Sequence, residues 1–109
     1  MMKHVKAGVK FDGCKPELVD GMLIAQTTLL KFGYTLVITA GSDGQHKEGS
    51  LHYRGYAFDL RTRDMRVQDI PTVVRDLRLY LAKDWQVVQE KDHIHAEYDP
   101  QKDGGLTLP

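Results

Sequence analysis

The chain has 109 residues, which is the size of one domain. Apolar residues make up 41% of it, enough for one modest core, and 15 basic residues balance 15 acidic ones. This balance argues against the basic surface of a nucleic-acid binder and against a polybasic membrane anchor. No apolar run approaches the roughly 20 residues that a membrane span needs. We therefore expect neither nucleic acid nor a membrane as a partner.

The N-terminus and the cysteine content bear on location. Residues 1–6 have no apolar core and so do not form a secretory signal, which predicts a protein that is cytoplasmic as synthesised. The single cysteine, Cys14, excludes a disulfide within the chain, and we interpret it as an incidental or buried thiol. We expect one monomeric domain over residues 1–109, with residues 100–109 as a loose tail.

The first predicted element is a helix over residues 16–32. Apolar residues recur there at helical spacings and share one face. They are Leu18, Val19, Met22, Leu23, Leu29 and Leu30. Pro16 suits the first helical turn, and Gly33 is a natural C-terminal stop. The β-branched run 36–39, bounded by Gly41, predicts a buried strand.

A polar, glycine-rich loop follows over residues 41–49, and residues 56–61 alternate as a strand does. We expect Asp69 to be the N-cap of a second helix. The apolar stripe of that helix is Ile70, Val73, Val74, Leu77 and Leu81. Residues 85–89 and 93–98 predict two more strands with a tight connection.

The order of these elements predicts the fold class. Strands that follow one another closely favour antiparallel pairing. An additional strand is expected within residues 5–11. The class is therefore α+β, a small antiparallel sheet with two main helices packed on it.

Three side chains have the chemistry of a catalytic zinc site. Zinc prefers nitrogen, sulfur or carboxylate ligands, and a catalytic zinc keeps three protein ligands and one open position. His52 and Asp59 lie on either side of Gly55, at the entry to a strand, and His95 lies on a later strand. These three residues predict a site for one Zn²⁺ ion, although the spacing alone also fits ordinary loop and packing residues.

A longer pattern sharpens this prediction. Residues 50–59 read Ser-x-His-x-x-Gly-x-Ala-x-Asp, and a strand with His-x-His follows later. This pattern resembles the zinc D-Ala-D-Ala carboxypeptidases and L-alanyl-D-glutamate endopeptidases, whose metal site is shared by the hedgehog signalling domain. The similarity extends over residues 8–100, and all five defining positions of the motif are met.

The resemblance implies a role for each site residue. It implies that His52, Asp59 and His95 are the zinc ligands. It also implies that Asp92, three positions before the last ligand, is the general base, and that His93 stabilises the oxyanion. Ser50 would lie near the substrate.

Two features leave alternatives open. Glu90 stands three residues before His93, so Glu90 could be the base and His93 the ligand. His93 and His95 share one face of a strand, so Asp92 must lie in the bend before it. Many family members also carry an arginine in the loop before the motif, and residues 42–48 contain none.

The predicted function is hydrolysis of peptide bonds in the stem peptides of bacterial peptidoglycan by a zinc-activated water. The partner implied is therefore the stem peptide, reached by phage-type release of an endolysin-like protein. A first alternative is a zinc-binding recognition or structural module of the same fold that lacks activity, which the missing loop arginine favours. A second is a peptidase or amidase that acts on D-amino-acid dipeptides in the cytoplasm.

Overall fold

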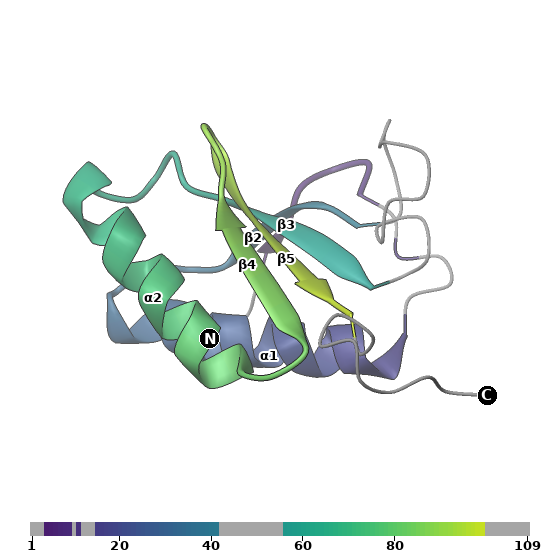
Figure 1. Cartoon of the computed structure of the whole chain (residues 1–109). Coiled ribbons are helices and arrows are strands. Elements are labelled where there is room, and N and C mark those ends of the chain that lie inside the picture. The colour runs from purple at the N-terminus through teal and green to yellow at the C-terminus, as the bar shows by residue number, and fades with distance from the viewer. Residues whose placement is uncertain (1–3, 10, 12–14, 42–55, 100–109) are drawn as a thin grey trace.

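The computed structural model describes residues 4–9, 11, 15–41 and 56–99. In chain order these described residues form two helices, a short 3₁₀ helix and five strands (Figure 1). These are β1 (His4–Val5), α1 (Pro16–Lys31), β2 (Val37–Ala40), β3 (Ala57–Arg61), η1 (Val67–Asp69), α2 (Ile70–Leu81), β4 (Trp85–Gln89) and β5 (His93–Tyr98).

Helix α1 buries a narrower stripe than the sequence predicts. Its buried apolar side chains follow helical spacing at Leu18, Met22, Ala25 and Leu29. Two members of the predicted apolar pattern, Val19 and Leu23, are instead 47% and 50% exposed. They are not part of the buried stripe of α1.

Helix α2 has the predicted apolar face, with Val73, Val74, Leu77 and Leu81 buried. Asp69 is the N-cap residue of α2, as predicted, but its side chain makes no capping hydrogen bond. Its carboxylate accepts hydrogen bonds from the Tyr34 hydroxyl and from Arg66 Nε. These bonds lower the pKa of Asp69, chiefly through Tyr34.

The strands form one sheet in the order β1-β2-β3-β5-β4. Strands β2, β3, β5 and β4 are paired antiparallel, and the short β1 pairs with β2 in parallel. The predicted α+β class, with a small antiparallel sheet and two main helices, is confirmed.

The two faces of this sheet differ in chemistry because side chains alternate along each strand. The face toward the helices carries buried apolar residues, among them Ile38, Phe58, Leu60, Val87, Ile94 and Ala96. Both helices lie on that side in Figure 1, with α1 against α2 and β3, and α2 against β4. Arg78 strengthens the second contact, because its guanidinium donates to the Val87 carbonyl at 2.8 and 3.0 Å. The opposite face is left for polar side chains. Within the described ranges, no helix is long and apolar enough to cross a membrane.

Candidate metal centre

Pairing of β3 with β5 brings the predicted site residues together. Asp59 is the partner of His95 in the register, and Arg61 is the partner of His93. All four positions alternate with core residues, so their side chains share the face opposite the helices. Residues more than 30 positions apart in the sequence therefore become cross-strand neighbours.

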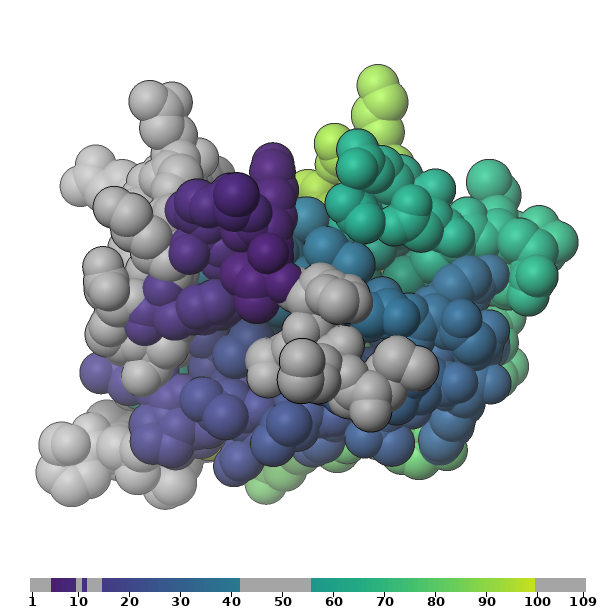
Figure 2. Space-filling model, turned by 180° about the vertical axis from the view of Figure 1, so that it is seen from behind, coloured from purple at the N-terminus to yellow at the C-terminus, as the bar shows by residue number. Residues whose placement is uncertain are grey.

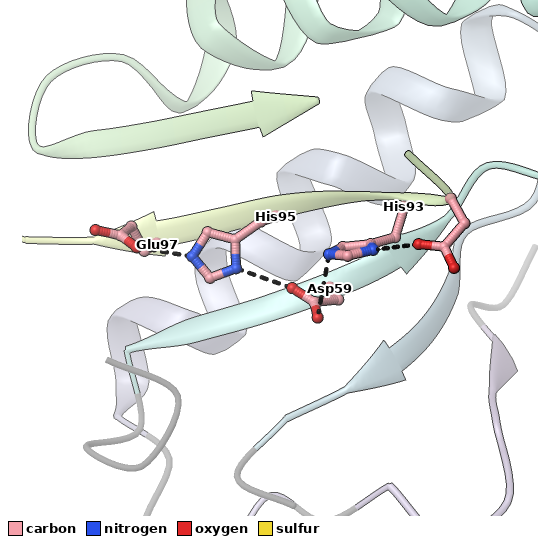
Figure 3. Close-up of polar contacts among 5 residues, drawn as sticks. Asp59, His93, His95 and Glu97 are labelled. Atoms are coloured by element: carbon pink, nitrogen blue, oxygen red, sulfur yellow. Dashed lines mark hydrogen bonds and ion pairs between the residues drawn. The ribbon is translucent and has the colours of Figure 1, made fainter. Parts of the chain in front are cut away.

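Imidazoles and carboxylates alternate in a row across this face (Figure 3). His95 Nδ1 lies 2.9 Å from Asp59 Oδ1, and His95 Nε2 lies 2.7 Å from Glu97 Oε1. His93 Nε2 lies 3.7 Å from Asp59 Oδ2, and its Nδ1 lies 2.8 Å from Asp92 Oδ1. Asp59 thus stands between the two histidines, and the closer contact is with His95.

The electrostatics of the row follow from these contacts. Burial opposes the charged form of His95, but its hydrogen bonds to Asp59 and Glu97 outweigh burial and raise the pKa of His95. The hydrogen bond from His93 lowers the pKa of Asp92, which is 85% exposed. Without a metal ion these contacts therefore favour the protonated form of His95.

A cleft of about 340 Å³ opens beside this row. Asp59, Asp92 and His93 line one part of it, and Thr39 and Ala40 of β2 line another. Asp92 lies in the bend immediately before β5, where it can bond His93 although the strand's alternation would separate them. A ligand in this cleft would contact both Asp59 and the group predicted to be a general base.

Two predicted site residues, His52 and Ser50, lie outside the described residues. Their roles as zinc ligand and substrate contact remain predictions. Among the described residues, no three side chains form a complete set of metal ligands. Asp59 and His95 are the two predicted ligands whose position the structure gives. Glu90 is exposed at the β4–β5 turn, where its backbone N–H donates to the His93 carbonyl.

Sequence reasoning missed Glu97. It stands two residues after His95, so it shares the same face of β5, and alternation could have identified it. Ligand histidines commonly donate their second ring N–H to a carboxylate, which fixes the tautomer and the orientation of the ring. The Glu97 contact with Nε2 has this form and leaves Nδ1 directed at Asp59.

These donors fit a zinc ion. Imidazole nitrogen and carboxylate oxygen are both zinc ligands. His95 Nδ1 and Asp59 Oδ1 already lie 2.9 Å apart. With Nδ1 unprotonated, these two atoms could both coordinate one ion, while Glu97 holds the imidazole at Nε2. The fit rests on the donor types and on this support.

The fold and this row define a small α+β domain with a row of histidines and carboxylates on one face of its sheet, and comparison with known proteins assigns it more closely. The model of the hedgehog amino-terminal signalling domain matches residues 23–97. The Sonic hedgehog protein of Danio rerio is 40% identical over 66 residues, which are 59% of this chain and 16% of that protein. The Indian hedgehog protein of Gallus gallus is 38% identical over 66 residues, which are likewise 59% of this chain and 16% of that protein.

The chain belongs to the hedgehog amino-terminal signalling domain family. Its match spans 16% of the length of these curated relatives. The hedgehog side of the predicted resemblance is therefore confirmed, and none of these relatives is a bacterial peptidase.

Several functional predictions are corrected by this family membership. The predicted hydrolysis of peptidoglycan is wrong, and so are the stem peptide as partner and the endolysin-like role, because the family is one of signalling domains. The predicted cytoplasmic location with phage-type release is also wrong, since the chain belongs to a family of signalling domains. These inferences came from the bacterial members of the resembled group, which carry the same motif.

Proposed function

We propose that this chain is a zinc-stabilised recognition domain of the hedgehog type, which binds a protein partner across the face of the metal centre. The observation that carries this proposal is the family match over residues 23–97, which includes the row from Asp59 to Glu97. Zinc would be held by His52, Asp59 and His95, with Glu97 orienting the last of these. When bound, the ion would fix the polar face of the sheet and offer a positive centre to the partner.

The environment of Asp92 favours recognition over hydrolysis. A general base works best when its pKa is raised toward the operating pH. The Asp92 carboxyl is 85% exposed, and its neighbour His93 lowers its pKa. Asp92 is therefore a weak base in this arrangement, although its charge suits it to contact a partner.

Zinc-dependent cleavage of a peptide bond is a second candidate function. It is favoured by one observation, that Asp92 and His93 line the same cleft as Asp59. In that case Asp92 would accept a proton and His93 would stabilise developing negative charge. The substrate would then be a protein or peptide that this signalling domain binds.

Metal analysis and a peptide assay together test the proposal. We expect about one zinc per chain after gel filtration, as a three-ligand site implies. Asp59→Ala and His95→Ala should lose it, and Asp20→Ala, an exposed carboxylate on α1, should keep it. The zinc-loaded chain should leave a pool of quenched fluorescent peptides uncut.

Each outcome points to one function. Cleavage of the pool that disappears with Asp92→Asn would select the peptidase. No zinc in the parent chain would contradict both candidates. Zinc lost from His93→Ala but kept by His95→Ala would move the ligand to His93 and Glu90 into the position of the base.

A further inference from the structure

The cleft beside Asp59 also has a basic wall. Lys6, Arg61 and Arg63 line it, from the segment after β1, from β3 and from just beyond β3. Figure 2 shows the N-terminal segment (purple) and the β4–β5 end (yellow-green) reaching the same upper edge of the molecule. Parts of the chain far apart in the sequence therefore place their charges around one opening, which we call the basic cleft.

Arg61 is fixed within this wall. Its Nη2 donates to Asp64 Oδ2 at 2.7 Å, and its Nε is enclosed with no acceptor among the described residues. Within the same part of the chain, neither Lys6 nor Arg63 forms an ion pair, and both are exposed. The cleft thus combines one held guanidinium with two cations whose charge is available to a ligand.

We propose that the basic cleft binds a single carboxylate of a peptide ligand, with Lys6, Arg61 and Arg63 as its counter-charges. This inference rests on the proposed function, because the peptide is the partner segment held over the metal centre. The inference goes beyond that function by specifying that the partner presents a carboxylate to this cleft.

The charge of the lining favours one carboxylate over a polyanion. Three cations line the cleft together with two carboxylates, Asp59 and Asp92, and Arg61 is also paired with Asp64, so the cleft carries no large positive excess. A sulfated glycan or a nucleic acid would bring several negative charges close to both aspartates. A cavity of about 340 Å³ also encloses only a small part of a ligand.

The strand register sets where the carboxylate lies relative to the metal centre. Arg61 is two residues beyond Asp59 on β3, which is about 7 Å along an extended strand. A peptide group at the centre and a carboxylate at Arg61 would therefore be separated by one to two residues of extended ligand. Either an acidic side chain or a terminal carboxylate meets this spacing.

Three defined peptides test the proposal by NMR titration of the ¹⁵N-labelled full chain, with zinc and with chelator. They are acetyl-Ala-Asp-Ala-amide, its Asn counterpart, and acetyl-Ala-Ala-Ala with a free carboxylate. We expect the Asp or the free-acid peptide to shift the amides of Thr39, Ala40 and Arg61, and the Asn peptide to bind more weakly. The stronger of the first two peptides identifies the source of the carboxylate.

Charge-removing variants complete the test. Arg63→Gln should weaken binding about threefold, and addition of Lys6→Gln should bring the loss to about tenfold. Arg75→Gln is the matched control, because Arg75 is 73% exposed on α2 and pairs with Asp76. It should leave the affinity unchanged.

Several results would overturn the subsite. Equal binding of the Asp and Asn peptides would do so, as would equal losses in Arg63→Gln and Arg75→Gln. Peptide binding that requires zinc but is unchanged in Arg63→Gln would also overturn the subsite, since the carboxylate would then be a ligand of the metal ion only. A heparin fragment that displaces the peptide and binds far more tightly would replace it with a glycan site. Failure of the proposed function gives a different result. If the chain holds no zinc and the peptide still binds in the presence of chelator, the zinc-dependent function is wrong but the carboxylate site remains supported.

Discussion

Gly21 is buried in the middle of α1, where glycine is an unfavourable helix residue. The ring of Trp85 from β4 fills the space that a side chain would occupy. A Cβ atom built on Gly21 would lie 2.3 Å from Cη2 and 2.4 Å from Cζ2 of Trp85. We therefore expect Gly21→Ala to destabilise the protein, although alanine is the better helix former.

Two opposing effects set the magnitude. Alanine in place of glycine contributes about 1 kcal/mol to helix stability, and overpacking a core costs about 1–3 kcal/mol. The overpacking cost should lie in the upper half of this range, because neighbouring rings restrict the movement of the Trp85 indole. Its ring centroid is 6.1 Å from that of Phe58 and 5.6 Å from that of Tyr98. The net loss in free energy of unfolding should be about 1–2 kcal/mol.

A double-mutant cycle with Trp85→Phe, measured by urea unfolding, tests this reasoning. Phenylalanine lacks the Cη2 and Cζ2 atoms of the indole, so Gly21→Ala should become stabilising by up to about 1 kcal/mol in that background. The coupling free energy should then be about 2–3 kcal/mol. A Gly21→Ala effect of the same sign in both backgrounds would refute the assigned contact.

Two further predictions concern the metal centre. The pKa of His95 is raised in the folded, metal-free chain, so the stability it contributes is complete below its unfolded pKa and is lost as the pH rises through the folded value. With chelator, the melting temperature measured by calorimetry should therefore fall from pH 6 to pH 8. The increase in melting temperature caused by zinc should instead grow over this range, because protons compete with zinc for the ligands at the lower pH. An increase that becomes smaller from pH 6 to pH 8 would contradict the ligand assignment. Glu97→Gln should weaken zinc binding about 10–100-fold in a competition titration with a chromophoric chelator, since it removes the carboxylate that orients the His95 ring. The exposed Glu17→Gln is its control, and equal zinc affinities of the two variants would remove Glu97 from the centre.

The elements were predictable because their signals are local. Hydrophobic spacing located both helices, and β-branched or alternating runs located β2 to β5. The strand expected within residues 5–11 is only the short β1, at His4–Val5. Local patterns do not say how much of a helix its neighbours cover, so Val19 and Leu23 belong to the apolar pattern although they are exposed in the folded chain. The N-cap position of Asp69 was predictable, but the partner of its carboxylate was not, because Tyr34 lies 35 residues away in the sequence.

The candidate site was predictable in its donors but not in its arrangement. Alternation placed His93 and His95 on one face and required Asp92 to lie in the preceding bend, as the structure shows. No spacing rule gives the pairing of Asp59 with His95, because it depends on which strands of the sheet are neighbours. The cations of the basic cleft depend on the same sheet order, since β1 and β3 lie on either side of β2.

The function was the hardest part to predict, and the reason is chemical. A motif that specifies two imidazoles and a carboxylate specifies affinity for a metal ion, and it is the same whether a water or a partner occupies the remaining position. What separates the two uses is the environment of the groups around the ion. Here the exposed, ionised Asp92 and the basic wall beside Asp59 suit the binding of a charged partner more than the transfer of a proton. These features arise from burial and from contacts between strands, so they become visible only after the chain has folded.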